Sequence, residues 1–280
     1  MESIIPWMGG KSRISDKIVE MMPKHRCYVE PFSGGLSIFF AKPQSKIEIF
    51  NDLNSELINF YKMIQNNVEE FKRREKYELY SRQLYYEYLE DMLSGKHYSL
   101  PDIERAFRFL YLLKNSVNSH MGAGLKVGIT KNDASRFFRT FDNIDKFTLR
   151  LKDVVIDNRD FAEVMTQCDS VDTLHFIDAP YILAPVGEYY FRFYRMFNKS
   201  DKGKGYKLVQ GKGFSLYDHQ RLYELCRSMK GKFIQTIDEC QWIKDRYANK
   251  PGKFWVYDNT FFYASKGEFV KELIITNYDV

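Results

Sequence analysis

The chain has 280 residues and a formal net charge of +5, with 44% hydrophobic and 28% charged residues, which supports a sizeable core and argues against a disordered chain. No apolar run approaches the roughly 20 residues that a membrane-spanning helix needs, and the first residues do not form an export signal. The four cysteines are scattered without a Cys-x-x-Cys pair, so we expect a cytoplasmic protein with neither a disulfide framework nor a metal site.

The first predicted elements alternate between strand and helix. Residues 27–32 form a short apolar run, a Ser-Gly-Gly turn follows, and residues 36–41 are compatible with a helix. A second apolar run at residues 47–50 ends in an Asn-Asp pair, and Asn54 can cap the helix that follows. This alternation is typical of βαβ units.

Residues 67–114 interrupt the alternation. Their charged and aromatic side chains recur at helical spacing, which predicts a helical insertion. Residues 115–139 are rich in Asn, Ser, Gly and basic residues, and this composition predicts turns or a hairpin in a presented loop region.

The alternation resumes after the insertion. The remaining predicted elements are a strand at 154–156, a helix at 161–167, a strand at 174–177, a helix between Ser215 and Lys230, a strand at 233–237 and a final pair of strands at 254–257 and 272–277. We therefore predict a doubly wound, Rossmann-like α/β sheet built from residues 1–66 and 153–280, with residues 67–152 as an inserted, mostly helical domain.

Three strand ends carry candidate functional residues, because ligands collect at the carboxyl ends of strands in open α/β sheets. The turn at residues 30–35 lets the backbone approach a ligand, although glycine turns after strands are common. Asp52 can accept hydrogen bonds from ribose hydroxyls or can cap a helix. The sequence Asp-Ala-Pro-Tyr at 178–181 is either an ordinary strand exit or a catalytic turn. The segment Pro-Trp-Met-Gly-Gly-Lys at 6–11 has no obvious core role and favours the functional interpretations.

The combination of these motifs resembles the Dam-type (D12 class, alpha-group) DNA adenine N6-methyltransferases, which use S-adenosylmethionine. The resemblance covers nearly the whole chain, and the order of the motifs is specific. The matching segments are Pro6–Lys11, Glu30–Gly35, Asn51–Asn54, Asp160-Phe161, Asp178–Tyr181, Gly213–Ser215 and Ile275–Tyr278.

The resemblance implies a methyltransferase sheet with an inserted DNA-recognition domain, and it assigns roles to individual residues. Trp7 and Lys11 help to close the cofactor pocket. Pro31, Phe32, Ser33, Gly34 and Gly35 lie against the methionine moiety of the cofactor, and Asp52 holds its ribose hydroxyls. Asp160 and Phe161 contact the cofactor adenine. Asp178, Ala179, Pro180 and Tyr181 receive the target base, and Asp178 also borders the cofactor.

The residue types at 178–181 suit amine methylation. The exocyclic amine of adenine is a poor nucleophile because its lone pair is delocalised into the ring. A carboxylate at Asp178 and the carbonyl of Ala179 can accept its two hydrogens and favour a tetrahedral nitrogen. The base must leave the duplex to be reached, and Tyr181 can stack on it. This chemistry is mainly positioning and requires no metal.

Ala179 departs from the Asp-Pro-Pro-Tyr tetrapeptide that is usual in the family. The carbonyl is retained, but part of the rigidity that proline gives the turn is lost, so we expect weakened or retained methyl transfer rather than its abolition. Two alternatives stay open. The chain can be a non-catalytic DNA-binding homologue, or it can methylate cytosine N4 or RNA.

Two basic segments predict contact with double-stranded DNA. Residues 105–152 contain ten Lys or Arg against three Asp, and residues 192–212 contain seven against one. We expect a monomer; a partner restriction endonuclease and the recognition sequence are left open, since the family's Asn-Gly-Leu-x-Arg type of segment is replaced here. The candidate DNA-contacting residues are Asn115, Asn118, Ser119, His120, Lys126, Arg136, Arg139, Lys202, Lys204, Lys207 and Lys212.

Overall fold

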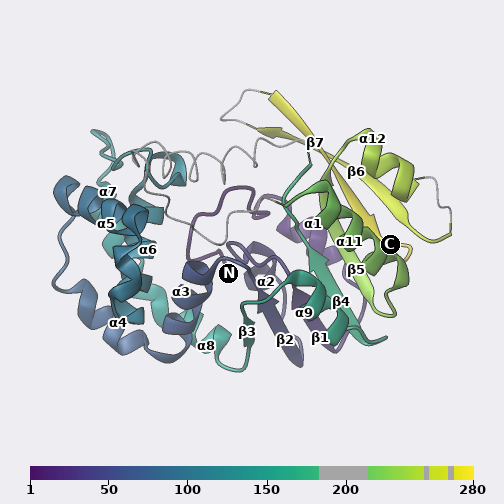
Figure 1. Cartoon of the computed structure of the whole chain (residues 1–280), viewed down its shortest axis with the longest axis horizontal. Helices are drawn as coiled ribbons and strands as arrows, with labels where there is room; N and C mark the ends of the chain where they lie inside the picture. Colours follow the sequence, from purple (N-terminus) through teal and green to yellow (C-terminus); the bar gives the residue numbers. More distant parts are fainter. Residues whose placement is uncertain (183–213, 249–251, 264–267) are drawn as a thin grey trace.

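The computed structural model describes residues 1–182, 214–248, 252–263 and 268–280. Within these ranges a seven-stranded sheet has the strand order β3-β2-β1-β4-β5-β7-β6 (Figure 1). The strands are β1 (Cys27–Glu30), β2 (Ile47–Asn51), β3 (Val155–Asp157), β4 (Thr173–Ile177), β5 (Lys232–Asp238), β6 (Trp255–Tyr263) and β7 (Glu268–Thr276). The predicted Rossmann-like sheet is confirmed.

The order in which successive strands are added to the sheet reverses at β1. This strand pairs in parallel with β2 on one side and with β4 on the other. Such a reversal opens a crevice at the carboxyl ends of the two central strands, where ligands bind in doubly wound folds. β7 runs antiparallel between β5 and β6, and the pairing of β6 with β7 extends both final strands beyond their predicted bounds.

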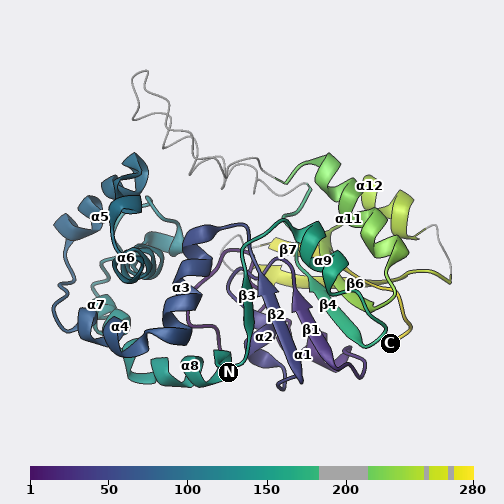
Figure 2. The ribbon, with the colours of Figure 1, turned by 60° about the horizontal axis from the view of Figure 1, so that its bottom comes forward.

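Helices cover both faces of the sheet (Figure 2). In β4, Phe176 packs into one apolar cluster and Ile177 into the other, because neighbouring strand residues point to opposite faces. The first cluster includes side chains of α1 (Ser15–Glu20) and α2 (Ser37–Ala41). The second cluster includes side chains of α9 (Phe161–Gln167), α11 (Leu216–Ser228) and α12 (Gln241–Ile243), the last of which continues into a π-helical turn at Lys244–Ala248.

Helix α3 (Ser55–Asn66) joins the sheet to the inserted helices. Asn54 caps it as predicted, and its side chain accepts hydrogen bonds from the backbone of Glu56 and Leu57. The buried face of α3 belongs to the same apolar cluster as the buried residues of the inserted helices. The division at residues 66 and 152 stays a prediction, since the core continues across it.

The inserted segment is mostly helical, in agreement with its predicted character. Figure 1 shows these helices beside α3, at the end of the molecule opposite β6. The helices are α4 (Val68–Glu75), α5 (Arg82–Ser94), α6 (Asp102–Asn115), α7 (Asp133–Phe138) and α8 (Ile144–Leu151), with short 3-10 turns at Lys96–Ser99, Val117–Ser119 and Phe141–Asn143.

Three arginines of the first basic segment belong to ion pairs inside the protein. Arg105 pairs with Glu56, Arg108 lies 2.7 Å from carboxylate oxygens of both Asp91 and Glu104, and Arg150 pairs with Glu48. The charge of residues 105–152 therefore overstates what is available to DNA phosphates. In the described part of the chain, no helix combines the length and apolar character that crossing a bilayer requires.

Candidate active site

The carboxyl ends of β1, β2 and β3 are held together by two side chains from the end of β2. The Asn51 amide donates to the carbonyls of Pro31 and Arg159, at 3.0 and 2.9 Å, and its oxygen accepts from the Arg159 backbone. The Asp52 carboxylate accepts from the backbone N–H groups of Gly34 and Asn54 at 3.0 and 2.9 Å. Burial raises the pKa of Asp52, and these hydrogen bonds oppose the rise.

Trp7 lies on the glycine turn that follows β1. A Cβ atom added to Gly34 would lie 2.6 Å from the indole nitrogen of Trp7, and one added to Gly35 would lie 2.6 Å from its Cβ. Gly34 also has a φ of +45°. The glycines therefore make room for the tryptophan, and the structure brings the Pro6–Lys11 segment directly onto the turn.

Ser33 and two aromatic side chains give this turn the character of a ligand cradle. The Ser33 hydroxyl is buried and has no hydrogen-bond partner among the described residues. Phe32 stacks on Phe161 with ring centroids 5.2 Å apart. Asp160 caps α9, and its carboxylate pairs with Arg221 at 2.7 Å. An unsatisfied hydroxyl beside aromatic faces and a capping carboxylate suits a ligand with both polar and flat parts.

Asp178 stands at the carboxyl end of β4, on the face of the sheet opposite to the buried Ala179 side chain. Its Oδ1 atom lies 2.8 Å from Lys11 Nζ and accepts a hydrogen bond from the Thr236 hydroxyl at 2.7 Å. No hydrogen bond from the described residues reaches Oδ2. The Asp178 side chain is 20% exposed, so the carboxylate is not sealed in the core.

Tyr181, the last residue of the tetrapeptide, is held by two side-chain contacts. Lys11 Nζ lies 4.9 Å from the centroid of the Tyr181 ring, and the phenol donates to Glu272 Oε1 at 2.8 Å. Burial raises the pKa of Tyr181 well above its usual value, and Asp178 and Glu272 add to the rise. The next backbone N–H, of Ile182, donates to Asp238 at 2.9 Å. The tetrapeptide is thus held from β5 and β7.

Glu30 is a second acid near Asp178. It is buried, and the Tyr28 hydroxyl donates to it at 2.7 Å. Burial raises the pKa of Glu30 to about 8, a rise that the Tyr28 hydrogen bond and Lys42 oppose and Asp178 increases. At neutral pH the Glu30 carboxyl group is therefore mostly protonated and adds little negative charge beside Asp178.

The predicted DNA-contacting residues differ in their exposure. Asn118, Arg136 and Arg139 are exposed, Ser119, His120 and Lys126 are half-buried, and Asn115 is buried. Asn118 and Ser119 have positive φ values of 52° and 58°, which are uncommon for residues other than glycine. Lys202, Lys204, Lys207 and Lys212 lie outside the described residues.

Lys114 joins this basic surface, although the sequence alone did not single it out. With Arg136, Arg139 and Thr140 it lines a hollow of about 330 Å³. Its Nζ atom donates to the Ile4 carbonyl at 3.1 Å. Burial, and then Arg136 and Lys126, lowers the pKa of Lys114 to about 8. Its signal in the sequence is a lysine at the end of the apolar helix α6.

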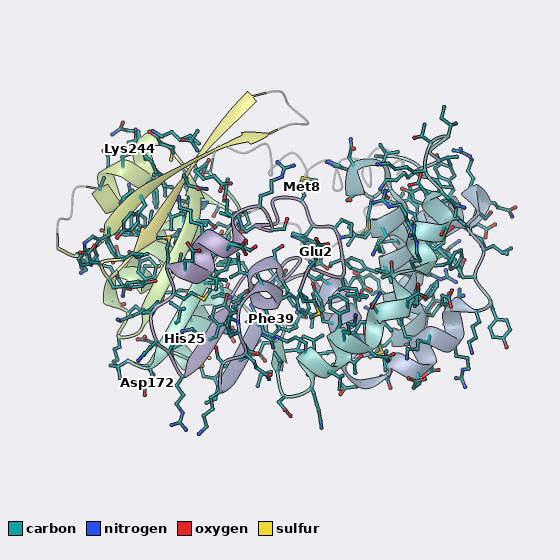
Figure 3. The ribbon with its side chains drawn as sticks, turned by 180° about the vertical axis from the view of Figure 1, so that it is seen from behind. Glu2, Met8, His25, Phe39, Asp172 and Lys244 are labelled. Atoms are coloured by element: carbon teal, nitrogen blue, oxygen red, sulfur yellow. The ribbon has the colours of Figure 1, made fainter. Side chains whose placement is uncertain are left out.

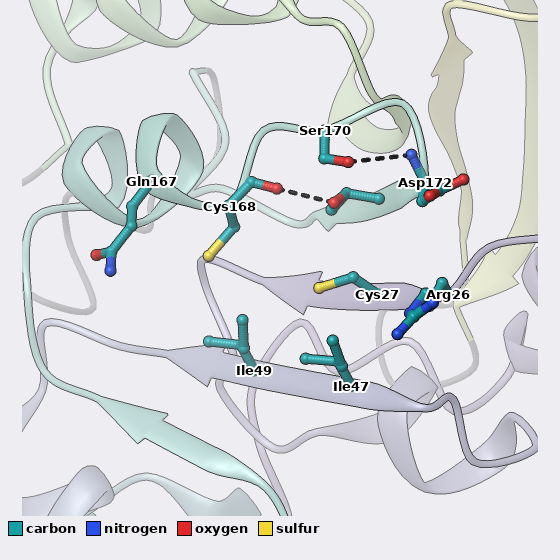
Figure 4. Close-up of a pocket in the computed structure, with 9 residues that line it drawn as sticks. Arg26, Cys27, Ile47, Ile49, Gln167, Cys168, Ser170 and Asp172 are labelled. Atoms are coloured by element: carbon teal, nitrogen blue, oxygen red, sulfur yellow. Dashed lines mark hydrogen bonds between the residues drawn. The ribbon is translucent and has the colours of Figure 1, made fainter.

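A cavity of about 460 Å³ lies at the other end of the strands, at the amino ends of β1, β2 and β4 (Figure 4). Cys27 and Cys168 line it, and all four cysteines are free. Figure 3 places Met8 at the end of the sheet that carries the motifs, and His25 and Asp172 at the other end. This cavity is therefore separate from the tetrapeptide. Within the described ranges, no group of acidic, His and Cys side chains could hold a metal ion.

The strand order, the glycine turn after β1 and the acidic tetrapeptide after β4 define a Rossmann-like methyltransferase. The model of the family described as D12 class N6 adenine-specific DNA methyltransferase matches residues 7–260. The chain belongs to this family and is a DNA adenine methyltransferase that uses S-adenosylmethionine. The resemblance stated from its motifs is confirmed.

Curated relatives agree with this placement. The type II methyltransferase M1.LlaDCHI of Lactococcus lactis subsp. cremoris is 27% identical over 97% of this chain and 94% of its own length. The type II methyltransferase M.MjaIII of Methanocaldococcus jannaschii is 25% identical over 80% of this chain and 88% of its own. The DNA adenine methylase of Escherichia coli is 32% identical, over 41% of each chain.

Proposed function

We propose that the chain methylates the N6 amine of an adenine flipped out of duplex DNA, and that the residues at the carboxyl ends of β1 and β4 carry the reaction. The observation behind this proposal is the environment of Asp178. One of its oxygens is fixed by Lys11 and Thr236, the other is open, and an anchored aromatic ring stands beside it. A carboxylate oriented in this way suits a ligand that carries N–H groups on a flat ring.

The cofactor would lie along the glycine turn after β1. S-adenosylmethionine, when bound, supplies an electrophilic methyl group on a sulfonium centre. Pro31 to Gly35 would contact its methionine moiety, with the free hydroxyl of Ser33 as a polar partner. Asp52 would accept from the ribose hydroxyls, and Asp160 and Phe161 would contact the adenine. Trp7 and Lys11 would close the pocket, because they already lie against the turn and Asp178.

The target amine would be positioned by two acceptors from the tetrapeptide. Asp178 Oδ2 would accept one N–H and the Ala179 carbonyl the other, which directs the nitrogen lone pair toward the methyl group. Tyr181 would stack on the base, and Pro180 would stiffen the turn between them. Lys11 would have to withdraw from its place over the Tyr181 ring before the base can stack there.

Duplex DNA would lie across the inserted segment. Arg136, Arg139 and Lys114 gather positive charge around one hollow and suit contact with phosphates. Asn118, Ser119, His120 and Lys126 belong to or follow the loop where side chains can reach base edges. We propose that a single copy of the chain acts on DNA in the cytoplasm, with the lysines of residues 202–212 adding further phosphate contacts.

The test is a methylation assay with labelled S-adenosylmethionine on DNA and, in parallel, on RNA, followed by digestion to nucleosides. Label on N6-methyl-2′-deoxyadenosine supports the proposal. Label on cytosine, or label only on RNA, would support the alternative acceptors, and cofactor binding without any transfer would support a non-catalytic DNA-binding homologue. Single-molecule sequencing of DNA from expressing cells then identifies the recognition sequence.

The Ala179→Pro variant completes the test. We expect the natural alanine to support transfer at a reduced or unchanged rate, because the carbonyl at this position is independent of the side chain. Absence of transfer by the alanine form, together with full transfer by the proline form, would contradict this expectation.

A further inference from the structure

Glu272 lies next to the target-base tetrapeptide but comes from the last described strand, 91 residues away from Tyr181 in the chain. It is 5% exposed, and its Oε1 atom accepts the Tyr181 phenol at 2.8 Å. Its other oxygen, Oε2, is buried and has no hydrogen-bond partner among the described residues. A carboxyl group in this position is costly, since burial of an unpaired polar atom is unfavourable.

The charged groups around Glu272 act in both directions on this cost. Burial raises the pKa of its carboxyl group, an effect that Lys11 and the Tyr181 hydrogen bond oppose and that Asp178 and Asp238 increase. An apolar side chain of similar length would fill the same volume without this penalty. An acceptor at this position provides a fixed end for the Tyr181 phenol, which an apolar side chain cannot.

A fixed phenol determines where the long axis of the Tyr181 ring lies. The backbone holds one end of this axis at Cβ, and the hydrogen bond to β7 holds the other at the phenol oxygen, so a swing of the ring away from Glu272 breaks the bond. When Lys11 leaves the ring face to admit a base, the ring loses its cation contact but keeps the bond to Glu272. The ring that offers the stacking surface is thus already in place when the base arrives.

We propose that Glu272 is a positioning residue for methyl transfer, which acts through the Tyr181 phenol to hold the stacking surface for the target base. This inference rests on the proposed function of the tetrapeptide. It predicts that Glu272 affects the orientation of the bound base, and therefore kcat, more than it affects DNA binding or the stability of the fold.

The experiment is a double-mutant cycle with Glu272→Met, Tyr181→Phe and the double variant, with Glu272→Gln as the conservative form. We expect Glu272→Met to lower kcat roughly 10- to 100-fold with less than about a threefold change in KM for DNA. Glu272→Gln should stay within about threefold of wild type, because its amide oxygen still accepts the phenol. In the Tyr181→Phe background, Glu272→Met should have less than about a twofold further effect.

A second readout does not depend on methyl transfer. DNA with 2-aminopurine at the target position reports the stacking of the flipped base through its fluorescence, and Glu272→Met and Tyr181→Phe should change this signal alike. The control is Glu239→Gln, which removes a carboxylate that pairs with Lys244 and Lys271 instead. It should change neither kcat nor the fluorescence.

The outcomes separate the two hypotheses. If the wild type methylates no adenine, the proposed function fails, and the 2-aminopurine signal still judges the role of Glu272. Equal losses from Glu272→Met in the wild-type and Tyr181→Phe backgrounds, or an unchanged 2-aminopurine signal, would overturn the inference. If Glu272→Met does not fold, as judged by its thermal transition, Tyr181→Phe removes the same hydrogen bond from the other side. It must then reproduce the loss of kcat and the altered fluorescence.

Discussion

Two buried lysines pair with carboxylates near opposite ends of the central strands, and the pairs differ in what surrounds the carboxylate. Lys42 lies 2.5 Å from Glu48, which also accepts from Arg150 and from the backbone of Ser45. Lys11 lies 2.8 Å from Asp178, whose Oδ2 atom receives no hydrogen bond from the described residues. The side chain of Glu48 is 2% exposed and that of Asp178 is 20% exposed.

The different surroundings of the two carboxylates indicate whether each ion pair contributes to stability or to activity. Glu48 is saturated by Lys42 at the end of α2, by the backbone of the following turn and by Arg150 of α8, and Arg150 ties the inserted segment to the sheet. Burial alone would raise the pKa of Glu48, but the hydrogen bonds from Arg150 and Lys42 lower it. Asp178 lies at the carboxyl ends of the strands, where the motifs gather, and its Oδ2 atom has no hydrogen-bond partner among the described residues. We expect the first pair to determine stability and the second to determine activity.

The largest effect should come from Asp178→Asn. The amide still accepts from Thr236 and Lys11, but it cannot stabilise the positive charge that develops on the amine, so methyl transfer should fall about 10³-fold. The free energy of unfolding should change by less than about 2 kcal/mol, because Lys11 keeps its hydrogen bond to the Gly9 carbonyl and the amide oxygen still accepts from it. Single-turnover rates and urea denaturation measure the two quantities. A large loss of stability with retained activity would reverse our assignment.

Glu48→Gln should produce the opposite result. Removing this carboxylate leaves Lys42 and Arg150 buried without their shared anion, which should lower the free energy of unfolding by about 3–5 kcal/mol. Well below the thermal transition, kcat should stay within about threefold of wild type. Urea denaturation and initial rates at low temperature decide. If kcat falls together with the free energy of unfolding, the two ion pairs do not have separate roles in stability and activity.

A pH effect should come from Glu30. Its pKa is raised from 4.5 to about 8 on folding, so the folded state binds more protons than the unfolded state between these values, and stability falls as pH rises through this window. The slope should reach up to about 1.4 kcal/mol per pH unit. Glu30→Gln keeps an acceptor for the Tyr28 hydroxyl and should be more stable than wild type at pH 8 but not at pH 4.5. Equal differences at the two pH values would contradict the raised pKa.

The smallest effect should appear at the basic hollow. Arg136→Gln and Arg139→Gln should each weaken DNA binding about uniformly across sequences and reduce the slope of log affinity against log salt by about 1. The matched control is Arg26→Gln, since Arg26 is also exposed but lines the cavity at the other end of the strands. Fluorescence anisotropy over a salt series gives the slopes. The same change for Arg26 and Arg136 would mean that the hollow has no special role.

Local signals made much of the fold predictable. The sequence predicted α9 with the bounds that the structure has, because Asp160 caps an apolar helical pattern between two strands. The Asn54 cap of α3 was predicted for the same reason. The separate motifs around Lys11 and Asp178 could be read as one site, although their contact at 2.8 Å could not.

Contacts between distant residues could not be predicted. The position of β7 between β5 and β6 depends on long-range pairing, which leaves no local signal. Glu272 could be noticed only as an acid within an apolar strand. Arg150 counted toward the charge of a basic segment that predicted DNA contact, and only the fold places it against Glu48. A count of charges along a sequence cannot separate ion-paired arginines from free ones.

The late position of β7 in the chain has a consequence for synthesis. Residues 268–276 pair with both β5 and β6, and they also supply the acceptor for Tyr181. While the chain is still emerging from the ribosome, β5 has an open edge and the proposed base pocket lacks one wall. The nascent enzyme therefore completes this proposed pocket only after residue 276 has left the exit tunnel, whereas the turn after β1 is synthesised early.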